Sequence, residues 1–271
     1  GDFSEALERY RDQTSRLEAL LARDPGDMEW RFRLADSMLS QVDVLAVTGR
    51  RADARERLTR PRAILETLVA HDSNNGPWLS ASLNARMKEV MLDRADGSLS
   101  LAVRSLNEIR PKIETLVAAE SSDVNFVGRL VTAWRLEAEL RLATGRADAS
   151  DAANRAVEYA AALINDARAD DKILGECALA HVIAGSIADA AGQRDPARHH
   201  WQRVRDVLNA RLVDSSNWRL LDPAARALAF LGRQEESLAM ITRLHALGHR
   251  PLQPWPATVA ADLSVSPSQN K

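Results

Sequence analysis

Cysteine and histidine are the residues here whose types and spacing could bind a metal. Cys177 and His181 stand four residues apart, and so do His245 and His249, which puts both members of each pair on one helix face. Zinc prefers thiolate and imidazole ligands, but its sites use three or four protein ligands. The spacing supplies no third ligand, so core packing and helix-end histidines are the simpler interpretations. We therefore predict no metal and no cofactor.

Nucleophilic and phosphoryl-transfer chemistry leave recognisable short motifs, and none occurs here. The sequence has no Gly-x-Ser-x-Gly, no phosphate-binding glycine-rich loop and no His-Glu-x-x-His. The carboxylates are scattered along predicted helices, where a solvated face is the usual explanation. We predict no catalytic residues and expect this segment not to be an enzyme.

A local cluster of arginines lies within the first quarter of the chain. Acidic residues, Asp53 and Glu56, are interleaved with it, so an exposed helix carrying ion pairs is favoured over a patch for an acidic partner. The cluster comprises Arg50, Arg51, Arg55, Arg57, Arg60 and Arg62.

Composition sets broad limits on the class of protein. Of the 271 residues 45% are hydrophobic, enough for a large core, and the net charge of -2 lacks the basic excess of a general nucleic-acid binder. A single cysteine, Cys177, rules out an internal disulfide. No run of 18 apolar residues occurs, so we expect no membrane span. The start at Gly1 suggests a segment cut from a longer protein.

The elements that must position any site are set by an internal repeat. The string Glu-Thr-Leu-Val-Ala begins at Glu66 and again 48 residues later at Glu114. The same spacing separates Gly49, Gly97 and Gly145, and also Trp30, Trp78 and Phe126. A fixed period of this size is typical of stacked repeats. Each unit is predicted to be a helix, a glycine turn and a second helix, after an initial helix over 3–23.

Two further features concern the helix boundaries. Pro61 and Pro111 fall inside predicted second helices and should kink or split them. A shorter last unit ends near Gly248, and prolines then become frequent. We therefore predict a repeat domain over 1–250 and an irregular C-terminal tail over 251–271, with Trp255 docking on the last helix. Trp218 and Trp255 are the tryptophans expected to make exposed contacts.

The pattern of each unit resembles the tetratricopeptide repeat family. The resemblance rests on a large apolar residue early in the first helix, a small turn residue such as Gly49, an alanine after it, and a loop such as Asp24-Pro25-Gly26. It covers about residues 3–248, and the 48-residue period departs from the usual 34. It implies an all-α fold, a right-handed α-solenoid of about five helix pairs.

The family also implies a binding surface. In such proteins the first helices of successive units line a concave groove that holds a peptide. The inward-facing polar residues implied by this alignment are Arg33, Asp36, Asn84, Lys88, Arg129, Thr132 and Arg135. Their surplus of donors favours a protein or peptide partner with an acidic segment.

Long units of this kind are similar to those of bacterial multidomain regulators. The leading expectation is a non-catalytic interaction or sensor module of a membrane-anchored serine/threonine kinase, lying in the periplasm. One alternative is a cytoplasmic regulatory module of a winged-helix transcription factor. A second is a helical domain that binds a small molecule.

Overall fold

The computed structural model describes residues 2–213 and 215–265, and over these residues the protein is all-α with no strand. Consecutive helices pack on one another in a repeat-like array. The helices are α1 Phe3–Arg23, α2 Met28–Val47, α3 Arg51–His71, α4 Gly76–Ala95, α5 Leu99–Ala119, α6 Val124–Ala143, α7 Ala149–Leu163, α8 Asp171–Ala190, α9 Arg194–Leu212, α10 Trp218–Phe230, α11 Gln234–Ala246 and α12 Ala257–Val265.

Helix starts follow the period seen in the sequence. A carboxylate or amide side chain caps each even-numbered helix from α2 to α10 and accepts a hydrogen bond from a backbone N–H of the first turn, which offsets one of the orphan donors there. For example, Asp27 accepts from the N–H of Trp30 at 2.8 Å. The capping residues are Asp27, Asn75, Asp123, Asp170 and Asn217.

Helix ends are equally regular. Gly49 and Gly97 follow α2 and α4 with φ of +80°, a left-handed conformation that glycine adopts without a Cβ penalty. The predicted glycine turns are therefore confirmed. Because caps and turns recur together, α1 and α2 have the same bounds as α3 and α4 shifted by 48 residues.

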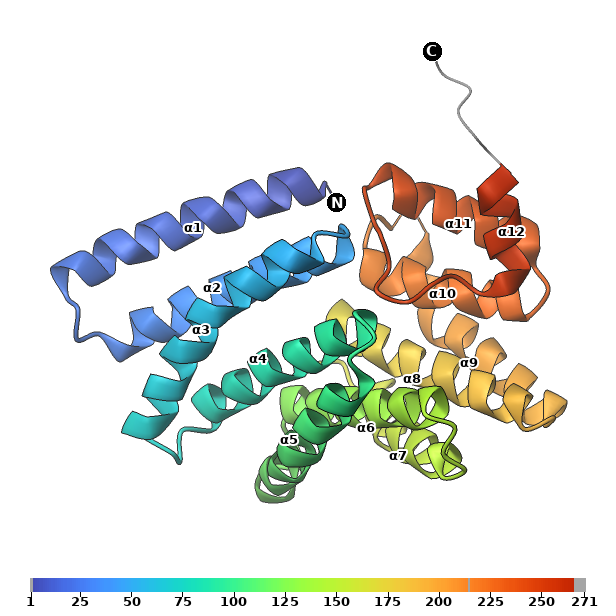
Figure 1. Cartoon of the computed structure of the whole chain (residues 1–271), viewed down its shortest axis with the longest axis horizontal. Helices are drawn as coiled ribbons and strands as arrows, with labels where there is room; N and C mark the ends of the chain where they lie inside the picture. The colour runs from blue at the N-terminus through green and yellow to red at the C-terminus, as the bar shows by residue number, and fades with distance from the viewer. Residues whose placement is uncertain (1, 214, 266–271) are drawn as a thin grey trace, which may run out of the picture. The chain divides into compact units, whose positions relative to one another are not determined.

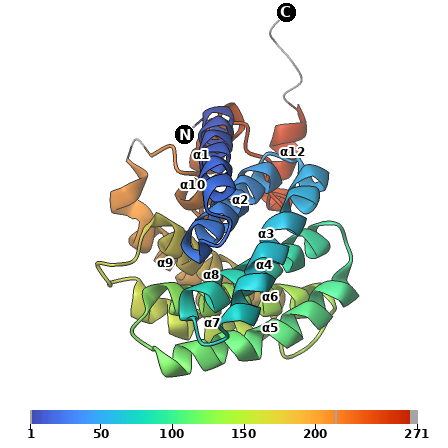
Figure 2. The same ribbon diagram turned by 90° about the vertical axis from the view of Figure 1, so that its left-hand side faces the viewer.

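The contacts divide the chain into two compact units, Gly1–Ser121 and Ser122–Lys271. In the first unit, α1 to α5 form an up-and-down series (Figure 1; Figure 2 shows the same series turned by 90°). Its core is built from fully buried apolar residues of α3 and α5, including Leu65, Leu68 and Ile109. Leu68 belongs to the repeated five-residue string, so the string serves packing there, as expected.

Pro61 and Pro111 do not split their helices. α3 runs unbroken past Pro61, and α5 past Pro111, so of the two expected outcomes, a kink or a split, the split is wrong. A proline removes one backbone hydrogen bond, whereas apolar residues on both sides of it, such as Leu58 and Leu65, are buried against neighbouring helices. That packing holds the two halves in one helix.

The second unit is organised around α8, which packs against α6, α7, α9 and α10. By length and composition alone α8 could cross a bilayer, but 72% of its most apolar window is buried inside this unit. Such burial is that of a core helix. It requires close approach of the neighbouring helices, which two glycines of α8 permit: Gly175 faces the backbone of α10 and Gly185 faces the indole of Trp201 on α9.

Gly185→Ala is expected to destabilise the protein, although alanine is favoured over glycine in a helix by about 1 kcal/mol. A Cβ at this position would lie 2.3 Å from Trp201 Nε1, and the Trp201 ring is fixed by stacking on Phe230 with ring centroids 4.8 Å apart. Overpacking of this kind typically costs about 1–3 kcal/mol. Urea unfolding measures the change. Gly128→Ala is the control, because its Cβ meets only the side chain of Ile173, at 3.3 Å. A more stable Gly185→Ala protein contradicts the prediction.

The C-terminal region corrects the expected irregular tail in part. Residues 251–256 are irregular as predicted, but α12 follows them and lies beside α10 and α11 (Figure 1). The run after Pro256 contains no further proline until Pro267, and Pro256 loses nothing by lacking an N–H ahead of the first turn. Val259 is fully buried in a cluster with Ala225, against which Trp255 packs, so the predicted docking of Trp255 is confirmed. Residues 266–271 lie outside the described residues.

Candidate functional site

The seven residues predicted to line a groove fall into two groups. In the first unit Arg33 and Asp36 are exposed on α2, and Arg33 pairs with Glu29 along the same helix. Asn84 is half-buried on α4, and the buried Lys88 pairs with Asp43 on α2. Lys88 therefore ties two neighbouring helices together.

The second unit holds Arg129, Thr132 and Arg135, all on α6. The Arg135 side chain is 2% exposed, and its guanidinium donates to Glu139 at 2.6 Å and to Glu176 of α8 at 2.9 Å. The Thr132 hydroxyl donates to the same Glu176 carboxylate at 3.1 Å. Burial alone lowers the pKa of Arg135, but these two glutamates raise it well above its usual value. Arg135 thus serves the packing of α6 on α8, and a role in partner binding stays a prediction.

The first pair of candidate metal ligands, Cys177 and His181, is neutral and buried. Burial raises the pKa of the Cys177 thiol to about 12, so it stays protonated. Burial, followed by the neighbouring His200, lowers the pKa of His181 to about 4, and the two Nδ1 atoms lie 3.2 Å apart, as in a neutral hydrogen bond. Within the described residues, no three His, Cys, Asp or Glu side chains are grouped so as to hold a metal ion. The core interpretation of Cys177 therefore fits the structure best.

His249, from the second histidine pair, lies instead in a largely buried cluster with Asp222, Arg226, Trp218 and Trp255. His249 Nε2 lies 3.1 Å from Asp222, which also accepts from Arg226. Trp218 stacks on His249, and Trp255 lies beneath the Arg226 guanidinium. The two tryptophans are half-buried, so their expected exposed contacts are largely internal ones.

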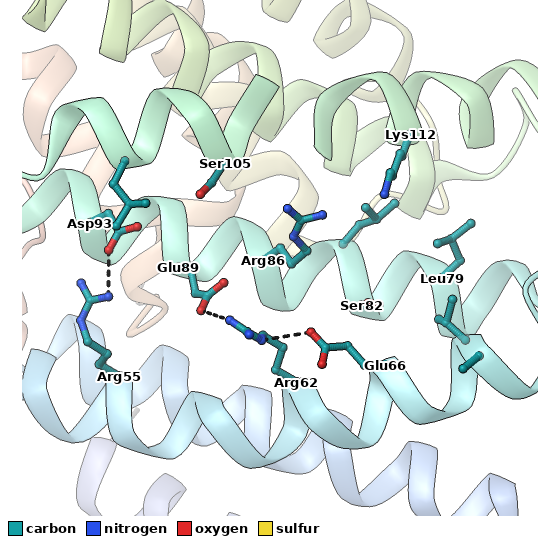
Figure 3. Close-up of a pocket in the computed structure, with 14 residues that line it drawn as sticks. Arg55, Arg62, Glu66, Leu79, Ser82, Arg86, Glu89, Asp93, Ser105 and Lys112 are labelled. Atoms are coloured by element: carbon teal, nitrogen blue, oxygen red, sulfur yellow. Dashed lines mark hydrogen bonds and ion pairs between the residues drawn. The ribbon is translucent and has the colours of Figure 1, made fainter. Parts of the chain in front are cut away.

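A groove in the first unit is a concave site that sequence reasoning did not find. α3 and α5 both pack on α4, but their backbones do not approach each other. Between them lies a continuous pocket of about 660 Å³ with α4 as its floor, which we call the α3–α5 groove (Figure 3). Apolar side chains line part of it, including Val69, Leu79 and the 43% exposed Leu101.

Ion pairs occupy one side of the α3–α5 groove. Arg55 donates to Asp93 at 2.8 Å and to Asp96, and the Arg55 hydrogen bond lowers the pKa of Asp96. Arg62 pairs with both Glu66 and Glu89 (Figure 3). Most arginines of the cluster over 50–62 are therefore engaged in ion pairs, as the favoured interpretation predicted.

Two cations occupy the other part of the groove. Arg86 of α4 donates to Glu108 at the rim, at 2.6 Å, while Lys112 of α5 has no ion-pair partner among the described residues. Both side chains extend into the space between α4 and α5 (Figure 3). Lys112 thus supplies a positive charge that the groove itself does not neutralise.

The class that fold and site define is an all-helical, repeat-like array with an open amphipathic groove. A scan against protein-family models finds no match to this chain, and a search of curated proteins finds no similar relative.

Proposed function

We propose that this chain is a non-catalytic protein-interaction module that binds a segment of a partner protein in the α3–α5 groove. The observation that carries the proposal is the groove itself, an open channel of about 660 Å³ lined by exposed Leu101 and by paired and unpaired charges. An exposed apolar side chain bordered by polar groups is typical of protein interaction sites.

The shape favours a peptide over a small compact ligand. Small-molecule sites enclose most of their ligand. The α3–α5 groove, in contrast, is open to solvent and lies between α3 and α5 over α4 (Figure 3). Side chains spaced along α4, from Leu79 to Asp93, contribute to the groove over several turns. A helix or an extended segment of similar length could contact all of them.

The architecture proposed with this function is a right-handed, tetratricopeptide-like solenoid of about five helix pairs. The matching bounds of α1–α2 and α3–α4 and the recurrent caps support it. By resemblance, we further propose that the module is the periplasmic part of a bacterial membrane-anchored serine/threonine kinase. A partner that binds one arrangement of the helices better than another would then shift the state of the attached domain.

Replacing Leu101 by aspartate is the direct test. Burial of a leucine side chain contributes about 1.5–3 kcal/mol, so Leu101→Asp is expected to weaken partner binding by about tenfold or more without loss of stability. Pull-down with the chain as bait, followed by titration of each captured protein, measures the effect. Leu142→Asp is the matched control, because Leu142 is 40% exposed but lies outside the groove. Equal weakening by both variants, or by neither, contradicts the choice of groove.

A further inference from the structure

The α3–α5 groove has an internal counterpart that shows what is special about it. Because α1 and α2 share their bounds with α3 and α4 after a shift of 48 residues, each position of one groove corresponds to a position of the other. The counterpart lies between α1 and α3, with α2 as its floor. Where equivalent positions of the two grooves carry different side chains, the fold does not require the side chain found in the α3–α5 groove.

The counterpart groove has an apolar cluster at its centre. Leu34 and Met38 of α2 are buried there together with Leu17, and the half-buried Leu21 and Ile64 pack against them. This cluster joins α1, α2 and α3. The packing of three successive helices therefore needs no charged side chain at the positions of this cluster.

The equivalent positions of the α3–α5 groove carry different chemistry. Ser82 replaces Leu34, Arg86 replaces Met38, and Lys112 replaces Ile64. Of the five apolar positions of the cluster, two have thus become cationic and one is serine, while Leu65 and Val69 stay apolar and the helix bounds are the same. A change of this kind costs packing energy, and functional sites are where such costs are usually found.

The mouths of the two grooves differ as well. Arg60 of α3 pairs with Glu18 of α1 at 2.5 Å, and Arg60 lines both of the smaller pockets, about 370 and 300 Å³, into which the counterpart groove is divided. The equivalent residues of the α3–α5 groove are Glu108 and Glu66. Two glutamates cannot form that bridge, and they turn to Arg86 and Arg62 instead. The groove therefore stays continuous and open.

We infer that Arg86 and Lys112 form a subsite for a carboxylate side chain of an acidic, leucine-containing peptide segment of the partner. The inference rests on the proposed function. The Lys112 ammonium lacks an ion-pair partner within the described part of the chain, and Arg86 can share its guanidinium between exposed Glu108 and an incoming carboxylate. Leu101 and Leu79, which line the same groove, supply the apolar contacts.

Peptide display on the intact protein tests this subsite. Random 12-residue peptides are selected on the wild-type protein, and each enriched peptide is then synthesised with its acidic residues and with the matching amides. We expect enrichment of Asp or Glu beside Leu, and an approximately tenfold or greater loss of affinity on conversion to amides, as for a charge-assisted contact.

The double variant Arg86→Met/Lys112→Ile is the matched control, because it restores the side chains of the counterpart groove. It is expected to keep the fold, with an unchanged or raised urea midpoint, and to bind acid and amide peptides equally. Selected peptides without acidic enrichment, or an undiminished acid preference of the double variant, overturn the subsite. A lowered midpoint also overturns it, since the cations would then serve the fold. Failure to enrich any peptide overturns the proposed function instead.

Discussion

Replacing Arg226 by alanine is expected to lower the free energy of unfolding by about 3–5 kcal/mol. Arg226 Nε donates to Asp222 Oδ1 at 2.7 Å, and the two side chains are only 8% and 10% exposed. Loss of the guanidinium leaves the Asp222 charge buried with the His249 contact alone. It also removes the hydrogen bonds to the carbonyls of Gln253 and Pro254, which hold the segment before α12 in place.

Urea unfolding at neutral pH measures this effect, with Arg233→Ala as the control. Arg233 pairs with Glu236 on the surface of α11, where the side chains are 36% and 52% exposed. Such surface pairs contribute about 0–1 kcal/mol. A similar small loss in both variants would show that the Arg226 cluster is dispensable for stability.

The contacts of Asp222 with Arg226 and His249 predict that the free energy of unfolding depends on pH. Burial by itself raises the pKa of Asp222, but the charge of Arg226 and the contact with His249 outweigh burial and lower it to about 2. The unfolded value is about 3.9, so the carboxylate contributes stability that is present above that pH and is lost as the pH falls towards 2. The stability difference between the wild type and Asp222→Asn should shrink over that interval. A constant difference would assign the effect to other groups.

Arg135→Ala is the second substitution with a large expected cost, again about 3–5 kcal/mol. Arg135 and Glu139 are each 2% exposed in their side chains, and Arg135 also reaches Glu176 of α8. Removing the cation leaves carboxylates at the α6–α8 contact without the charge that offset their burial. The destabilised contact should also lower the cooperativity of the second unit.

Arg33→Ala is the comparison that makes the Arg135 result informative. Both residues were predicted to line one groove, yet Arg33 is 64% exposed and, among the described residues, pairs along its own helix with Glu29. Its loss should cost less than about 1 kcal/mol. Circular dichroism during urea unfolding compares the two variants. An Arg135→Ala protein as stable as Arg33→Ala would return Arg135 to the set of partner-binding candidates.

Much of the fold could be predicted from the sequence because its signals are local. Helix caps such as Asp27 and turns such as Gly49 act within a few residues of themselves, so their 48-residue recurrence predicts where helices begin and end. Prolines were interpreted less well: Pro61 leaves α3 unbroken because buried neighbours on both sides outweigh one lost hydrogen bond. α12 was missed because a proline-rich composition says little about the residues that follow the last proline of the run.

The candidate site could be predicted much less well, because it depends on which side chains face one another. The helical spacing of polar residues does not show whether their side chains are available to a partner or form ion pairs within the protein. Lys88 and Arg135 form ion pairs with neighbouring helices. A signal for the α3–α5 groove was present in the sequence, where Arg86 and Lys112 stand at the positions of Met38 and Ile64. These two substitutions indicate a binding site only when the tertiary structure shows that α3, α4 and α5 surround the α3–α5 groove.

The sequence by itself therefore determined the helices of the repeat region, their period and the turns between them, since caps, glycines and apolar spacing act over short range. The tertiary structure decided which charges are neutralised, which glycines of α8 admit a neighbouring helix, and where an open groove remains. Those properties depend on the approach of residues that are far apart in the sequence, such as Arg135 and Glu176. The energy of a charged side chain depends on the groups packed around it in the folded protein, not on its position in the sequence.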